Sequence, residues 1–126
     1  MKRLPSIIER KNANETLYKK YLDGVREVEF PKANGYGRRV PFRVNILVQD
    51  PEALMMHLNS REISTRRFFY PLHKQPCFNR ENSGVAHKLE NAVKLFERGV
   101  SLPSGLSLSE NQIKYVCDCI REFYGP

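Results

Sequence analysis

The chain has 126 residues, of which 40% are hydrophobic and 28% are charged, and this composition excludes an intrinsically disordered protein. Its length predicts a single domain over residues 1–126 and excludes an enzyme with separate cofactor and substrate domains. The net charge is +7, and residues 1–43 carry 11 lysines and arginines against 5 acidic residues. Nucleic acid is nevertheless disfavoured as a partner, because the sequence lacks the aromatic stacking motifs of RNA-recognition modules.

The sequence contains no apolar run near the ~20 residues of a membrane span and no signal-peptide core, which indicates a cytoplasmic protein without a membrane partner. Three cysteines are present, Cys77, Cys117 and Cys119. The last two lie two residues apart in a predicted helix, so their side chains diverge and form neither a disulfide nor a shared metal site. Reduced thiols are therefore expected.

Apolar residues recur at intervals of three and four along residues 4–25, which predicts a long amphipathic helix. Pro5 suits its first turn and Gly24 its C-terminal end. We expect this helix to pack at both ends and to be wetter in its polar middle, residues 11–15. Residues 27–30 are a candidate short strand, and the glycines that follow indicate a loop.

Apolar and polar side chains alternate along residues 39–48, which predicts a strand with one buried face. The side chains expected on that face are Val40, Phe42, Val44, Ile46 and Val48. Asp50 is a typical N-cap, so residues 51–60 are predicted to form a helix. This helix is expected to bury Leu54, Met55 and Leu58. We interpret His57 as a partly exposed structural residue rather than a ligand, and we expect residues 63–69 to pair with the 39–48 strand.

Residues 65–78 read TRRFFYPLHKQPCF, with three consecutive aromatic residues and no acidic residue. Pro71 and Pro76 are incompatible with a helix or a central strand, so the sequence predicts a rigid, exposed loop. Its cationic side chains make the loop attractive to an anion. Cys77 lies four residues after His73, a spacing with no established nucleophile and base geometry. No catalytic residue is assigned, since no self-sufficient active-site motif occurs.

A helical pattern returns along residues 86–98 and ends before Gly99, which suits the C′ position. Residues 79–85 carry turn signals, residues 100–102 form a brief extended piece, and residues 103–106 form a turn.

The last helix is indicated by Ser109 and Gln112, which have the spacing of a capping box. Its buried side chains are expected to be Ile113, Val116, Cys117, Ile120 and Phe123 or Tyr124. The predicted order of helices and strands indicates an α+β fold, in which helices pack mainly on one face of a small, mostly antiparallel sheet.

The second half of the chain resembles the C-terminal portion of the DegT/StrS family of sugar-nucleotide aminotransferases, through the runs TRRFFYPLHKQPCF and NAVKLFERGVSLPSGLSLSENQIKYVCDCIREF. Sequences of that family end in a PLH-QP loop, a G-LP turn and an LT-EQ helix start. The first half resembles the family's long helix leaving the large domain, followed by a strand, a helix and a strand, through LPSIIERKNANETLYKKYLDG and PFRVNILVQDPEALMMHLNSREISTR. Within the family, FFYPLHKQP is most similar to perosamine synthases.

This resemblance implies a pyridoxal-phosphate (PLP) enzyme of fold type I, of which this chain is the small C-terminal domain. The Schiff-base lysine of the family lies upstream of the matched segment. The resemblance therefore implies that the chain binds no cofactor by itself and is inactive alone. Its implied partner is the large PLP-binding domain, which the chain does not contain. The implied substrate is a nucleotide-linked keto-deoxy sugar, with glutamate as amino donor, in polysaccharide or antibiotic sugar biosynthesis. A homodimer is implied for the full-length enzyme.

By the same resemblance, the substrate-binding residues are expected to be His73, Arg66, Tyr70 and Lys74. His73 would contact substrate, Arg66 would clamp a carboxylate or phosphate, and Tyr70 would line the sugar site. The residues alone also allow His73 to cap local backbone and Arg66 to lie exposed on an edge strand. Two other functions stay open: a stand-alone module that binds an anionic ligand or nucleic acid through basic residues 65–80, and a degenerate paralogue that docks on a full-length enzyme.

Overall fold

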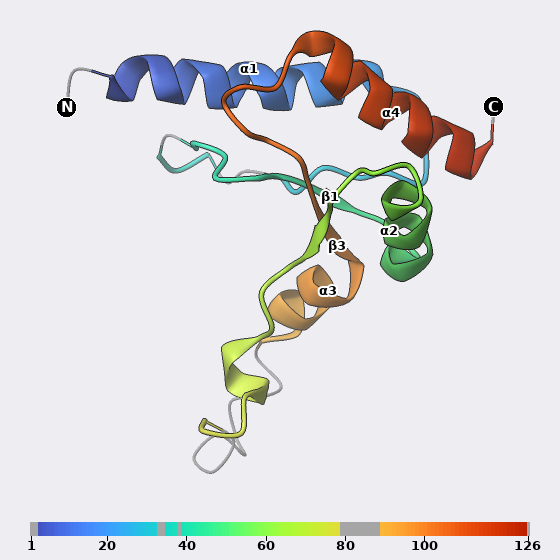
Figure 1. The fold of residues 1–126 in the computed structure, drawn as a ribbon. Coiled ribbons are helices and arrows are strands. Elements are labelled where there is room, and N and C mark those ends of the chain that lie inside the picture. The colour runs from blue at the N-terminus through green and yellow to red at the C-terminus, as the bar shows by residue number, and fades with distance from the viewer. Residues whose placement is uncertain (1–2, 33–34, 38, 79–88, 126) are drawn as a thin grey trace.

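The fold is defined by a computed structural model, which describes residues 3–32, 35–37, 39–78 and 89–125. The elements in chain order are α1 (Leu4–Tyr21), β1 (Val44–Leu47), α2 (Pro51–Asn59), β2 (Arg66–Arg67), the 3-10 turn η1 (Leu72–Lys74), α3 (Glu90–Arg98), β3 (Gly99–Leu102) and α4 (Glu110–Tyr124) (Figure 1). The predicted turn at 79–85 and the predicted start of the third helix at 86–88 lie outside the described residues.

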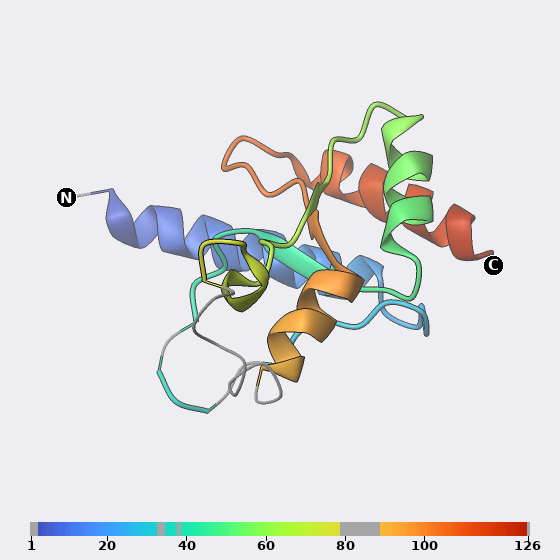
Figure 2. The same ribbon diagram turned by 90° about the horizontal axis from the view of Figure 1, so that it is seen from below.

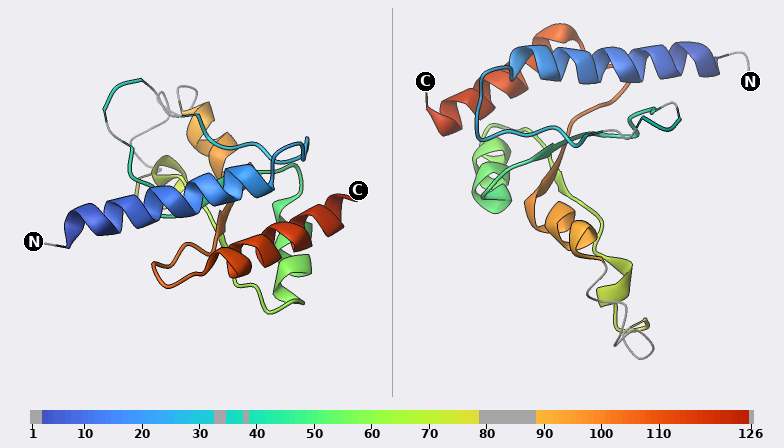
Figure 3. Two further views of the ribbon diagram at one scale, coloured as in Figure 1. Left: turned by 90° about the horizontal axis from the view of Figure 1, so that it is seen from above. Right: turned by 180° about the vertical axis from the view of Figure 1, so that it is seen from behind.

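Helices α1 and α4 lie together over one face of the sheet, while α3 lies on the other side of it (Figure 3). The three strands form an antiparallel sheet in the order β1-β3-β2, so β3 is its central strand. The predicted α+β fold with a small antiparallel sheet is confirmed. Among the described helices, none is long and apolar enough to cross a membrane.

Strand pairing differs from the sequence prediction in one respect. The 63–69 stretch does not pair with the earlier long strand; its two-residue strand β2 pairs with β3, where Arg66 lies opposite Ser101. Every residue of β3 is buried, and in the segment GVSL the apolar Val100 and Leu102 alternate with Gly99 and Ser101. Four residues with this pattern do not show whether a strand is central or at an edge. The sequence therefore predicted only a brief extended piece where the structure has the central strand.

Strand β1 is shorter than the predicted 39–48. Val44, Ile46 and Val48 are buried as expected, whereas Val40 is 42% and Phe42 71% exposed, so the prediction for these two was wrong. The reason lies in the partner strand. Val44 pairs with Leu102, the last residue of β3, and the proline that follows has no N–H to extend the ladder. The predicted 27–30 strand is reduced to one bridge between Glu29 and Leu47.

Helix α1 ends at Tyr21 rather than at residue 25, and of its two ends only the C-terminal one packs as expected. Its polar middle is packed: Asn14 is fully buried and its side-chain amide donates to the carbonyl of Gly105 at 3.0 Å. The N-terminal end is the exposed part, since Leu4 is 48% exposed. A hydrogen-bond partner 91 residues away explains why the sequence pattern missed this contact.

Helix α4 matches its prediction closely. The backbone N–H of Gln112 donates to Ser109 Oγ at 3.2 Å, and the Ser109 N–H donates to Gln112 Oε1 at 2.9 Å, which completes the capping box. Its buried side chains are Ile113, Val116, Cys117, Cys119 and Ile120. These side chains join the core beneath α1, where the hydroxyl of buried Tyr18 donates to the Pro103 carbonyl at 2.7 Å. Burial raises the pKa of Tyr18 above its ordinary value.

The N-cap of α2 is also confirmed, because the Ala53 N–H donates to Asp50 Oδ1 at 2.9 Å. Gly99, by contrast, is not a left-handed C′ residue. Its backbone is extended, with φ −82° and ψ 129°, and it opens β3 directly after α3. Glycine is required there by space, because an added Cβ would lie 2.4 Å from the Phe68 ring and 2.3 Å from the Leu95 carbonyl oxygen.

Candidate functional site

The proline-rich segment 65–78 is held at two points and exposed between them. Pro71 is buried, and the ring of Tyr70 meets Phe96 of α3 edge-on at 5.1 Å between centroids. Phe69 is 80% and Leu72 67% exposed. The segment is thus anchored to α3, while part of its apolar surface faces outward as predicted.

A hollow of about 480 Å³ lies between η1 and α3, which are side by side in Figure 2. We call it the η1–α3 hollow; it is lined by Tyr70, His73, Lys74, Glu90, Val93, Lys94 and Glu97. Three of the four predicted substrate-binding residues therefore gather at one site. The hollow carries both signs of charge, since lysines and glutamates line it together. Such a lining suits a polar, uncharged group better than a strong anion.

Arg66, the fourth predicted residue, does not line the η1–α3 hollow. It lies exposed on the two-residue strand β2, at the edge of the sheet, and lines a smaller hollow together with Arg43 and Ser64. The structural alternative for Arg66, an exposed position on an edge strand, describes its placement here. An anion bound by Arg66 there would meet Arg43 rather than His73.

Arg67, expected from the sequence only as one of the cations of the proline segment, also has structural contacts. Its Nη2 donates to the backbone carbonyls of Phe96 at 3.0 Å and Glu97 at 3.4 Å, and its guanidinium lies 5.2 Å from the Phe96 ring centroid. A cation at the C-terminal end of α3 also interacts favourably with the helix dipole. Arg67 therefore joins the proline segment to α3, beside the Tyr70 contact.

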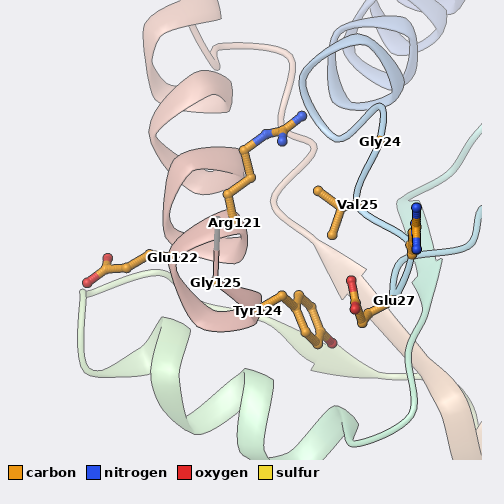
Figure 4. A pocket seen from close by; sticks show the side chains of 8 residues that line it. Gly24, Val25, Glu27, Arg121, Glu122, Tyr124 and Gly125 are labelled. Carbon is orange, nitrogen blue, oxygen red and sulfur yellow. The ribbon is translucent and has the colours of Figure 1, made fainter.

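Another hollow, of about 610 Å³, lies where α1 and α4 end, and Figure 4 shows its lining. Arg121 Nε and Nη2 donate to the carbonyls of Tyr21 at 2.8 Å and Asp23 at 2.6 Å, so this arginine closes the end of α1. Burial, with a smaller effect of Glu27, raises the pKa of Tyr124 to about 12, and this hydroxyl stays protonated at neutral pH. The residues around this hollow therefore connect the C-terminal ends of two helices. No sequence motif indicated a functional site there.

The remaining candidate ligands have structural partners. His57 Nε2 lies 3.0 Å from the Cys119 carbonyl and its ring packs on Phe123, which supports the structural interpretation. The cysteines are free as predicted, and burial raises the pKa of Cys117 to about 12. Cys77 donates to Gln75 Oε1 at 3.9 Å. Within the described residues, no group of three or more His, Cys, Asp or Glu side chains is arranged to hold a metal ion.

The fold as a whole matches a solved structure. The chain superimposes on DesV of S. venezuelae, solved in complex with a ketimine intermediate, with a TM-score of 0.87 and 25% identity, covering 98% of this chain and 33% of DesV. A model of the DegT/DnrJ/EryC1/StrS aminotransferase family matches residues 1–121, and the chain belongs to this family.

Two curated relatives carry the same name. The chain is 30% identical to the GDP-perosamine synthase of Vibrio cholerae over 98% of its own length, and 33% identical to that of Escherichia coli O157:H7 over 93%. It covers 34% and 31% of these two proteins, so it spans about a third of the length of the curated relatives it matches. The resemblance to the C-terminal part of the family, drawn from the proline loop and the last helix, is confirmed.

Proposed function

We propose that this chain is the C-terminal domain of a PLP-dependent aminotransferase that acts on a nucleotide-linked keto-deoxy sugar. The observation that carries the proposal is the family match along residues 1–121 combined with the coverage of only a third of each relative. On this proposal residues 1–126 form one domain, and a large PLP-binding domain supplies the catalytic groups. The full-length enzyme would work in the cytoplasm, as a homodimer, in polysaccharide or antibiotic sugar biosynthesis with glutamate as amino donor.

The described residues do not fit PLP by themselves. A lysine that forms a Schiff base is activated by desolvation or by a neighbouring cation. None of the described lysines is buried, and Lys94 in the η1–α3 hollow is 68% exposed with Glu90 at 3.9 Å. The cofactor, which supplies the electron sink for amino transfer, is therefore assigned to the large domain.

The role proposed for this chain is to line one side of the substrate pocket. In the η1–α3 hollow, His73 and Lys74 present donors for sugar hydroxyl or carbonyl oxygens, and Tyr70 presents an apolar ring that Phe96 holds in place. The half-buried His73 ring and the anchored Tyr70 ring favour positioning of substrate over chemistry on it. Arg66 would meet a charged group outside this hollow.

The chain alone is expected to form no Schiff base with PLP. Because none of the described lysines is buried, mixing equimolar chain and PLP at neutral pH should give no stoichiometric aldimine absorbance band and no borohydride-fixed product. Mass spectrometry after reduction measures the adduct. A single lysine modified in stoichiometric yield would refute the assignment of the cofactor to another domain.

A chimera tests the proposed function directly. The C-terminal third of the V. cholerae GDP-perosamine synthase is replaced by this chain, and formation of GDP-perosamine is measured. We expect turnover, and we expect His73→Ala in the chimera to lower kcat/KM by roughly 10- to 100-fold, the effect of losing one or two polar contacts to the reacting sugar.

Gln75→Ala provides the matched control, because Gln75 neighbours the same turn but does not line the η1–α3 hollow. It should leave kcat/KM unchanged. A folded chimera that holds PLP but makes no product would contradict the proposed function, whereas equal losses in both variants would contradict only the role of His73.

A further inference from the structure

Two small hollows adjoin each other along the edge of the sheet and share the side chains of Arg43 and Ser101. The larger, of about 240 Å³, is also lined by Arg39 and Arg67, and the smaller, of about 170 Å³, by Arg66. We call the pair the arginine cleft. Among the described residues, no aspartate or glutamate lines either hollow.

Arg43, at the centre of the cleft, is positioned but not neutralised. Its guanidinium carbon lies 5.2 Å from the ring centroid of Phe42 and 5.7 Å from that of Phe69. In the part of the chain that the structure describes, no carboxylate lies within ion-pair distance of it. Contacts with aromatic faces hold a guanidinium while leaving its N–H edges free for a carboxylate or phosphate.

Arg67 brings a second unused donor. Its Nη2 is occupied by the carbonyls of α3, but Nη1 is buried and has no hydrogen-bond partner among the described residues. A buried donor without a partner is costly, and an anion in the larger hollow would satisfy it. Arg39 contributes less charge, since it lies 2.8 Å from Glu15 Oε1.

The walls of the cleft are fixed by contacts with other elements. Lys11 of α1 donates to the carbonyl of Phe42 in the wall of the larger hollow and to that of Ser104 in the wall of the smaller one, both at 2.9 Å. On the floor, the shared Ser101 hydroxyl donates to Asn45 Oδ1 at 2.8 Å. A site built in this way loses little entropy when it binds an ion.

We propose that the arginine cleft binds an organic diphosphate, with one phosphate in each hollow and Arg43 between them. A single phosphate or carboxylate fills one hollow only and leaves either Arg66 or the Nη1 of Arg67 without an anionic partner. Phe69 lines the larger hollow and the next residue, Tyr70, lines the η1–α3 hollow, so a sugar in that hollow and a diphosphate in the cleft lie along one continuous segment. Assignment to the nucleotide sugar rests on the proposed function; binding of diphosphate does not.

The experiment is calorimetric titration of the 126-residue chain with pyrophosphate, with GDP and, separately, with phosphate and glutarate at low ionic strength. Pyrophosphate and GDP should bind at least tenfold more tightly than phosphate or glutarate. Arg43→Gln should weaken pyrophosphate binding at least tenfold, and so should Arg66→Gln, whose exposed position on β2 makes it harmless to folding. Arg26→Gln removes the same charge from an exposed site outside the cleft and should change little.

Equal affinity for phosphate and pyrophosphate would overturn the two-hollow assignment. An equal loss of pyrophosphate affinity in Arg26→Gln and Arg43→Gln would show that binding depends only on the net charge of the chain. That result would also overturn the two-hollow assignment. Pyrophosphate bound well and GDP not at all would restrict the cleft to inorganic diphosphate and refute the organic ligand. The chimera of the preceding section is a separate measurement, so its failure leaves a positive titration standing, and a failed titration leaves the family function untouched.

Discussion

Replacing Ile120 with aspartate is expected to unfold most of the protein at room temperature. Ile120 lies on α4 with 0% exposure, inside the core formed by α1, α4 and the sheet. Loss of a buried aliphatic side chain of this size costs ~2–5 kcal/mol, and a buried carboxylate without a partner adds to that cost. The sum approaches the whole stability of an ordinary domain, ~5–15 kcal/mol.

Urea denaturation followed by far-UV circular dichroism measures the effect. Ile120→Val is the matched control and should cost only ~0.5–1.5 kcal/mol, because it removes one methylene group and keeps the apolar surface. An unchanged denaturation midpoint for Ile120→Asp would show that this face of α4 is not docked on the core.

Features that local sequence determines were predicted well. The capping box of Ser109 and Gln112 and the N-cap of Asp50 each depend on residues three positions apart, and both are present. The core face of α4 follows from helical periodicity, because its partners are simply the apolar interior. That Cys117 and Cys119 do not bond to each other followed from their spacing.

Features that depend on distant residues were not predicted. Strand β3 is central because β1 and β2 pair with it on either side, and nothing in its own four residues indicates that position. Where β1 begins is decided by the end of β3 at Leu102, which lies 58 positions after Val44. Burial of Asn14 likewise depends on Gly105.

The candidate site shows the same division. The composition of the proline segment indicated a binding loop, and three of its residues, Tyr70, His73 and Lys74, do line one hollow. The sequence could not show which arginines keep unpaired N–H groups, since that depends on α3 carbonyls and aromatic rings brought in by the fold. Arg43 therefore emerged only from the structure, as did the unpaired Nη1 of Arg67, which the sequence had indicated only as one cation of the proline segment.

Replacing Gly99 with alanine is expected to destabilise the fold and to disturb the arginine cleft together. The φ and ψ values of Gly99 suit any residue, so the cost is purely steric. The new methyl group would lie 2.3 Å from the Leu95 carbonyl oxygen and 2.4 Å from the Phe68 ring. Backbone in α3 cannot yield without shifting the α3–β3 junction, so we expect a loss of ~2–3 kcal/mol, at the upper end for overpacking.

Thermal denaturation should show a melting temperature lower by roughly 4 °C or more for each kcal/mol lost. Gly105→Ala is the matched control, because its nearest neighbour would lie 3.9 Å from the new Cβ, and it should be close to neutral.

If the Phe68 ring carries part of the clash, Phe68→Ala should cost less in the Gly99→Ala background than alone. Since Phe68 also lines the larger hollow of the arginine cleft, Gly99→Ala should weaken pyrophosphate binding even in the folded protein. An unaltered melting temperature would mean that α3 and β3 can move apart without cost. It would contradict the close packing of Gly99 against Phe68 that joins the proline segment to the sheet.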